Sequence, residues 1–269
     1  MSSLKFGCHD FLNAQPLLRN LRKQACDIDL EIHTGSPGEL ADLLKEGDLD
    51  FAMIPSYEYL KRINQYRLLP GVCIASKGKV DSVFLVSKEK DLLQVRSVAA
   101  DCRSRTSIAV LKILFGERFH KDWEIISTEP DLELMLENNS AALIIGDAAL
   151  EINRSKPYTV LDLSEEWLAR TGKPFVHAVI AIREGAEIPG KTVTAIQNAT
   201  RKDHGLVESV CRDYAKGTEE KFSLCKDYLI GKINYRLGPE EIEGMKEFQK
   251  MCANIDNDMP QSEYIWERS

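Results

Sequence analysis

Four short polar turns carry the residue types in this chain that could bind or transform a small anion. Each turn follows an apolar segment and precedes a helical pattern. The first turn of a helix offers free backbone N–H groups and the positive end of the helix dipole, so it can hold a carboxylate or a phosphate. The turns are Phe11-Leu12-Asn13-Ala14, Ile54-Pro55-Ser56-Tyr57, Ser104-Arg105-Thr106-Ser107 and Ile145-Gly146-Asp147-Ala148.

The turn over residues 104–107 is chemically the richest of the four. It places three hydroxyl groups and the Arg105 guanidinium within four residues, a set that can hold a carboxylate by hydroxyl, backbone and arginine hydrogen bonds. Ordinary helix capping is the alternative at every turn, because Asn, Ser, Thr and Asp are preferred cap residues. The residues alone therefore indicate an anion-binding cleft and no particular ligand.

Asp147 and two histidines fit such a cleft less simply. Asp147 would repel a carboxylate, so we expect it to cap a helix, with acceptance of a hydrogen bond from a ligand hydroxyl as the alternative. His9 lies near the first turn and His177 lies in a later apolar strand. For both we expect a structural histidine with satisfied hydrogen bonds, and a general base is the second option.

Short apolar strands alternate with amphipathic helices along the chain, which predicts an α/β fold with mainly parallel sheets. Asn13 is expected to cap the first helix, over residues 15–24. Segments 71–76 and 82–87 are expected to form a hairpin that turns at Gly78. The other predicted strands cover residues 4–8, 29–33, 49–54, 97–100, 123–127, 141–145 and 175–182, and three helices are expected from 191 to 256.

The order of these elements predicts two lobes. The β/α pattern runs once, crosses over, restarts, and returns through the strand at 175–182. We expect residues 1–84 to begin the first lobe, 85–177 to form the second, and 178–269 to return to the first lobe with the C-terminal helices. The strand ends of the two lobes would then face each other across a cleft, where open α/β sheets bind ligands.

Composition excludes several other classes of protein. Of the 269 residues, 43% are hydrophobic and 29% charged, a balance typical of a globular chain. The net charge of −7, with no basic cluster, argues against nucleic-acid binding. No apolar run approaches the ~20 residues of a membrane span and no signal peptide is evident, so we expect a cytoplasmic location. The seven cysteines, Cys102 among them, form no CxxC pair, and no metal-ligand spacing or nucleotide-binding motif occurs.

A longer set of stretches occurs in the order of one enzyme family. These are residues 11–17, 47–50, 55–59, 71–76, 82–83, 101, 104–107, 142–147, 167 and 171–176. They resemble the chorismate dehydratases of the futalosine route to menaquinone over about residues 4–183. The chain departs from that pattern at Gln15, where a basic residue is expected, and at the residues Cys8-His9-Asp10 before the asparagine.

The resemblance implies a two-lobed fold like that of type II periplasmic binding proteins. It implies loss of water from chorismate to give 3-[(1-carboxyvinyl)oxy]benzoate, with no cofactor. Asn13 and Ser82 match the positions associated with catalysis in the family. The candidate substrate-binding residues, from the turns and the family motifs together, are Ser56, Ser104, Arg105, Thr106, Ser107, Gly146 and Asp147.

The chemistry of chorismate fits this assignment. Removing the C3 hydrogen pushes electron density into the ring carboxylate, and loss of the C4 hydroxyl then gives an aromatic ring. We expect donors of the turn 104–107 to hold that growing charge, Asn13 to assist the departing hydroxyl and Ser82 to orient the enolpyruvyl ether. The matched motifs contain no obvious protein group that could act as the base. The resemblance to the family suggests the substrate's own enolpyruvyl carboxylate as the base.

Two alternatives remain from the sequence. One is the sibling enzyme of the same pathway and fold, which makes 1,4-dihydroxy-6-naphthoate from a cyclised futalosine derivative. The other is a non-catalytic binding protein or sensor for a small anion. The turn 104–107 and the stretch 13–17 favour the dehydratase.

Overall fold

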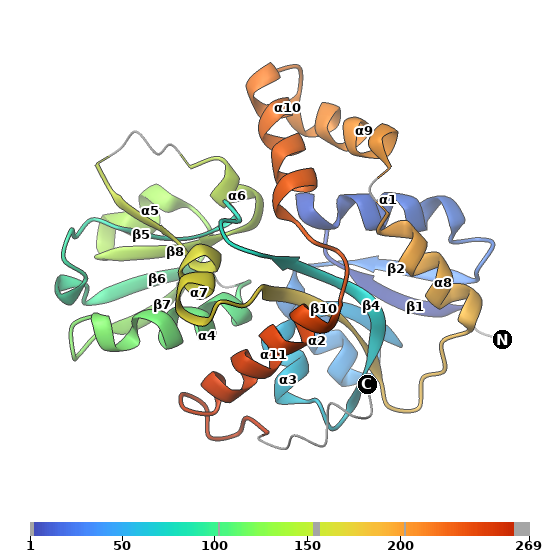
Figure 1. Ribbon diagram of the computed structural model, residues 1–269, viewed down its shortest axis with the longest axis horizontal. Coiled ribbons are helices and arrows are strands. Elements are labelled where there is room, and N and C mark those ends of the chain that lie inside the picture. The colour runs from blue at the N-terminus through green and yellow to red at the C-terminus, as the bar shows by residue number, and fades with distance from the viewer. Residues whose placement is uncertain (1–2, 102, 153–156, 202, 261–269) are drawn as a thin grey trace.

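Two five-stranded sheets with helices packed on them form two lobes, as the computed structural model shows (Figure 1). The structure describes residues 3–101, 103–152, 157–201 and 203–260, so Cys102 lies outside the described residues. Within the described residues, no helix is both long enough and apolar enough to span a membrane.

The first sheet has the order β2-β1-β3-β10-β4. β1 pairs in parallel with β2 and β3, and β10 runs antiparallel between β3 and β4. Four strands therefore run in one direction and β10 alone runs in the other. The strands are β1 (Leu4–Cys8), β2 (Leu30–Thr34), β3 (Phe51–Pro55), β4 (Tyr66–Ser76) and β10 (Phe175–Arg183).

The second sheet repeats this arrangement in the order β7-β6-β8-β5-β9. β6 pairs in parallel with β7 and β8, while β5 is antiparallel to both β8 and β9. The single reversed strand in each sheet, β10 or β5, is the one that enters from the other lobe. The strands are β5 (Val83–Ser87), β6 (Ser97–Asp101), β7 (Glu124–Thr128), β8 (Ala141–Ile145) and β9 (Thr159–Asp162).

Helices cover the sheets and extend the first lobe (Figure 1). α9 and α10 pack against each other above the rest of the first lobe, and a π-helical turn, Asp227–Lys232, follows α10. The helices of the first lobe are α1 (Gln15–Gln24), α2 (Pro37–Glu46), α3 (Ser56–Lys61), α8 (Gly190–Ala199), α9 (His204–Ala215), α10 (Glu219–Lys226) and α11 (Pro239–Cys252). Those of the second lobe are α4 (Arg105–Phe115), α5 (Leu132–Asn138), α6 (Gly146–Leu150) and α7 (Leu163–Thr171).

The prediction of a hairpin that turns at Gly78 is wrong. β4 belongs to the first sheet and β5 to the second, so residues 77–82 cross between the lobes. A short polar link between two apolar strands has the same sequence pattern in a hairpin and in a crossing. The C-terminal expectation of three helices is also wrong, because α8 and α9 are separate helices and four α-helices follow β10 in the described residues.

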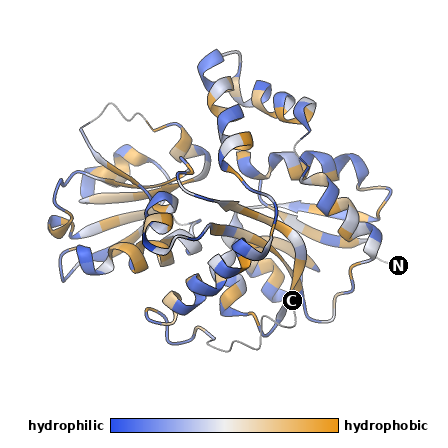
Figure 2. Ribbon diagram, in the orientation of Figure 1, coloured by the Kyte–Doolittle hydropathy of each residue, from blue (hydrophilic) through white to orange (hydrophobic). Residues whose placement is uncertain are grey.

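The core lies on both sides of the sheets. Every residue of β3, β5 and β8 is buried, as expected for strands covered by helices on both faces. Figure 2 shows hydrophobic residues concentrated in the strands and hydrophilic residues on the outer helix faces. The rigid sheets therefore hold the strand ends, and the turns that follow them, in fixed positions.

Candidate active site

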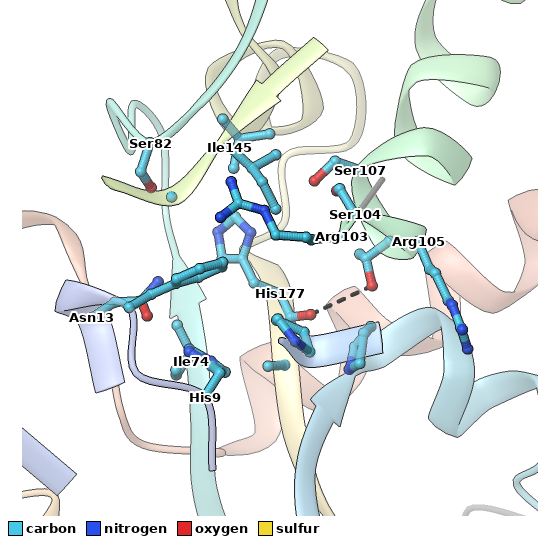
Figure 3. Close-up of a pocket in the computed structure, with 17 residues that line it drawn as sticks. His9, Asn13, Ile74, Ser82, Arg103, Ser104, Arg105, Ser107, Ile145 and His177 are labelled. Atoms are coloured by element: carbon cyan, nitrogen blue, oxygen red, sulfur yellow. Dashed lines mark hydrogen bonds between the residues drawn. The ribbon is translucent and has the colours of Figure 1, made fainter. Parts of the chain in front are cut away.

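A cavity lies between the lobes, where strands of both sheets end (Figure 3). It contains about 560 Å³ of empty space, part of it open to solvent. Both lobes contribute to its wall, because the turns after β1 and β6 meet there. The lining residues are His9, Phe11, Asn13, Pro37, Pro55, Ile74, Ser82, Val83, Arg103, Ser104, Arg105, Thr106, Ser107, Ile145, Gly146, His177 and Ala178.

Two of the candidate residues from the sequence do not line this cavity. Ser56 is fully buried, and its hydroxyl donates to the Val176 carbonyl at 2.6 Å. Asp147 accepts a hydrogen bond from the Leu12 N–H at 2.9 Å and so links the two lobes. The structure brings the other seven candidates together at the cavity: Asn13, Ser82, Ser104, Arg105, Thr106, Ser107 and Gly146.

Helix capping does not account for the polar residues of the four turns. α1, α3, α4 and α6, which follow these turns, have no hydrogen bond from a side-chain cap. α2, α5, α7 and α9 do have one, from Ser36 or from an aspartate. The expected caps are therefore wrong for Asn13 and Asp147: Ala14 is the N-cap of α1, and Ile145 is the N-cap of α6.

The residues of the turn 104–107 divide into two pairs with different partners. The Arg105 guanidinium extends away from the cavity (Figure 3) and pairs with both oxygens of Asp42, at 3.0 and 2.6 Å. The Thr106 hydroxyl accepts from the Tyr57 N–H at 3.2 Å and donates to the His177 carbonyl at 3.5 Å. Arg105 and Thr106 therefore join the second lobe to the first.

The hydroxyls of Ser104 and Ser107 are the other pair. Neither hydroxyl has a hydrogen-bond partner among the described residues, and both residues line the cavity at the start of α4. They are 4% and 6% exposed, so a bound anion there would be largely shielded from water. Together with the free N–H groups of the 11-residue helix α4, they form an oxyanion-binding arrangement.

Arg103 brings a cation to the cavity wall, and the sequence did not single it out. Its guanidinium donates to both oxygens of the fully buried Asp101, at 2.8 and 2.6 Å. The guanidinium carbon lies 5.1 Å from the centroid of the Phe11 ring, a cation–π contact across the lobes. A signal was present in the sequence, because an aspartate two residues before an arginine at a strand end can hold it in place.

The cavity wall requires glycine at position 146. Gly146 has a φ of +63°, and a Cβ atom there would lie 3.2 Å from a ring carbon of Phe11. Any other residue would be strained in this backbone region and would displace the Phe11 ring.

The two histidines of the cavity differ in their hydrogen bonds. The His177 imidazole is hydrogen-bonded to the Ser76 hydroxyl at 2.9 Å, as expected of a structural histidine. The same expectation is wrong for His9, whose buried Nδ1 has no partner among the described residues. Burial lowers the pKa of each imidazole to about 4, so both are neutral near pH 7.

Because His9 is buried and neutral, we predict that the folded protein loses stability in acid. Its pKa is about 4 in the folded chain and near 6.5 when unfolded, so only the unfolded chain gains this proton between those values. The free energy of unfolding should therefore fall as the pH drops from 6.5 to 4, by about 3 kcal/mol for His9. Asp162 acts in the opposite direction, because burial raises its pKa to about 6. Its protonation stabilises the folded chain in acid, and this stabilisation is lost as the pH rises through that value.

Urea unfolding of the wild type and of His9→Gln at pH 7 and pH 4 measures this difference. Asp162 titrates in both proteins, so its effect cancels in the comparison. We expect the wild type to lose about 3 kcal/mol more than the variant on acidification, and the exposed His204→Gln to behave like the wild type. Equal losses in the wild type and His9→Gln would contradict the prediction.

Ser82 and Asn13 have partners in the C-terminal part of the chain. The Tyr228 hydroxyl donates to the Ser82 hydroxyl at 2.9 Å, and the Tyr235 hydroxyl donates to the Asn13 carbonyl at 2.6 Å. The side-chain oxygen of Asn13 is buried and has no partner among the described residues. Tyr228 is 146 residues from Ser82 in the chain, and no local pattern could have revealed this pair.

Known proteins of menaquinone biosynthesis are similar to this chain over almost its whole length. A family described as "Menaquinone biosynthesis" matches residues 4–254. A chorismate dehydratase of Thermus thermophilus is 31% identical over 263 residues, covering 90% of this chain and 92% of that protein. A chorismate dehydratase of Campylobacter jejuni is 25% identical over 256 residues, covering 93% and 98%.

Solved structures agree on the fold. A Candida albicans protein described as having the generic periplasmic binding protein fold superimposes with a TM-score of 0.64. It is 12% identical, and the match covers 100% of this chain and 94% of that one. With two lobes, one reversed strand in each sheet and a cavity between them, this chain has the periplasmic-binding-protein fold and belongs to the menaquinone biosynthesis family.

Proposed function

We propose that this protein is a chorismate dehydratase, which removes one water from chorismate and forms 3-[(1-carboxyvinyl)oxy]benzoate. The observation that carries the proposal is the uncapped start of α4, where the Ser104 and Ser107 hydroxyls face the cavity without partners among the described residues. The two relatives that are named chorismate dehydratases support it.

The ring carboxylate of chorismate binds at the start of α4. There it accepts hydrogen bonds from Ser104, from Ser107 and from the N–H groups of the helix. Arg103 adds positive charge to the same wall, although its pairing with Asp101 neutralises part of this charge. The anion is therefore bound locally although the chain as a whole has a charge of −7.

Proton removal and loss of hydroxide occur at neighbouring ring carbons. The C3 proton passes to the enolpyruvyl carboxylate of the substrate itself, and the C3–H electron pair flows towards the ring carboxylate. The C4–O bond then breaks, the departing hydroxide takes the same proton from the enolpyruvyl carboxyl group and leaves as water, and the ring becomes aromatic. No cofactor enters this scheme.

The protein stabilises the charge that this reaction creates. Electron density on the ring carboxylate grows in the transition state, so the donors of α4 bind the transition state more tightly than the substrate. Asn13 and Ser82, on the opposite wall (Figure 3), hold the departing hydroxyl and the enolpyruvyl ether in the reactive geometry.

We propose that the lobes divide close to the boundaries expected from the sequence, which gave 1–84 and 178–269 to the first lobe and 85–177 to the second. Both boundaries fall within the first few residues of a strand that enters from the other lobe: β5 begins at Val83 in the second sheet and β10 at Phe175 in the first. Hydrogen bonds and an ion pair join the two lobes beside the cavity: Leu12 to Asp147, Tyr57 to Thr106, and Arg105 to Asp42.

Incubation of the purified protein with chorismate tests the proposal. Mass spectrometry is expected to detect a product that has lost one water and has the absorbance of a substituted benzoate. Binding of chorismate without turnover would favour a sensor instead. Absence of both binding and turnover would favour the sibling enzyme of the pathway.

A further inference from the structure

Tyr228 lies behind the cavity wall, in the π-helical turn Asp227–Lys232 that follows α10. It is 1% exposed and does not line the cavity. π-helical turns are rare and occur often at functional sites. The ring reaches the cavity wall from the C-terminal part of the chain, a part to which the sequence assigned no role.

The contact between Tyr228 and Ser82 determines where the serine proton can go. Tyr228 donates its hydroxyl proton to the Ser82 oxygen at 2.9 Å. Burial raises the pKa of the Tyr228 hydroxyl far above its ordinary value, so it stays protonated and remains a donor. A serine hydroxyl that accepts from one partner still has its own proton to donate to another, and Ser82 lines the cavity.

The same tyrosine is close to Asn13. A hydrogen bond from the Asn13 side chain partly offsets the rise in the pKa of Tyr228. The Asn13 side-chain oxygen is buried and has no partner among the described residues. Tyr228 therefore lies between the two side chains that act on the substrate in the proposed reaction.

The backbone around Ser82 is held from both sides. Lys232, from the same π-helical turn as Tyr228, pairs with the carboxylate of Asp81. Asp81 has a φ of +62°, and its N–H donates to Asp162 at 2.7 Å. A fixed backbone leaves rotation of the Ser82 hydroxyl as the remaining freedom, and Tyr228 restricts that rotation.

We propose that Tyr228 is a positioning residue of the reaction. It directs the Ser82 proton to the substrate and keeps the Ser82 side chain correctly placed relative to the Asn13 side chain. The inference rests on the proposed chorismate dehydratase activity. Tyr228 itself does not touch the substrate, so its effect is transmitted through Ser82 and Asn13.

Tyr228→Phe removes the hydroxyl and keeps the ring. We expect kcat with chorismate to fall about 10- to 30-fold, because one preorganised hydrogen bond is lost. KM should change less than about threefold, since the carboxylate donors of α4 are untouched. Tyr66→Phe is the matched control: Tyr66 is a buried tyrosine of β4 whose hydroxyl has no partner among the described residues, and this variant should keep the wild-type kcat.

A double-mutant cycle with Ser82→Ala separates positioning from a general effect on the fold. If Tyr228 acts through Ser82, Tyr228→Phe should have little further effect on kcat in the Ser82→Ala background. Equal effects in both backgrounds would overturn the proposal, as would a Tyr228→Phe protein as active as Tyr66→Phe. A Tyr228→Phe protein that fails to fold also overturns it, because the hydroxyl would then serve the fold.

The wild-type assay distinguishes the two levels of failure. A wild-type protein that leaves chorismate unchanged overturns the proposed function, and this inference with it. An active wild type with an unaffected Tyr228→Phe variant overturns the positioning role alone.

Discussion

Asn13→Ala is expected to lower kcat for the dehydration of chorismate about 1,000-fold. Asn13 lines the cavity, and its buried side-chain oxygen has no partner among the described residues. In the proposed reaction this amide contacts the departing hydroxyl, and groups that assist a leaving group or hold a developing charge contribute roughly 10²–10⁴ to the rate. Steady-state kinetics with chorismate measure the loss.

The fold should survive this substitution. Asn13 lies in a 3₁₀ turn, Leu12–Ala14, and makes no cap hydrogen bond to α1, so alanine removes no helix cap. Asn20→Ala is the matched control, because Asn20 lies on α1, outside the cavity, and donates to the Ala199 carbonyl. Near-full turnover by Asn13→Ala, with both variants folded, would remove Asn13 from the mechanism.

The strand positions could be predicted from the sequence because burial on both faces gives a continuous apolar run. The strand Ala141–Ile145 was predicted at its observed bounds, and β1 likewise. The turns after such strands could then be placed at one edge of each sheet, since parallel strands end together. Most of the cavity wall was therefore predictable from local pattern, including Asn13, Ser104 and Ser107.

The local pattern could not predict which residues of each turn face the cavity and which contact the other lobe. Arg105 and Ser107 are two residues apart, yet the guanidinium pairs with Asp42 in the other lobe while the Ser107 hydroxyl faces the cavity. Which residue takes which role depends on side chains 63 residues away in the sequence. The same limit applies to Tyr228, whose partner is fixed by tertiary packing.

The double variant Ser104→Ala/Ser107→Ala is expected to lower kcat/KM for chorismate about 1,000-fold. Removal of one donor from an oxyanion site commonly costs roughly 10²–10³ in rate, and the two losses overlap because both hydroxyls serve the same carboxylate. The N–H groups of α4 remain, so turnover should not be abolished. Each single variant should lose less than the double variant.

Stability distinguishes this role from helix capping. Ser104 is the N-cap of α4 by position but makes no cap hydrogen bond, so its loss should leave the free energy of unfolding nearly unchanged. Asp131, by contrast, accepts from the Glu133 and Leu134 N–H groups at the start of α5, each at 3.1 Å. Asp131→Ala should therefore lose about 1 kcal/mol of stability and keep its kcat/KM. A serine double variant that is destabilised like Asp131→Ala while retaining kcat/KM would make the turn a helix cap and remove the anion site from the proposed reaction.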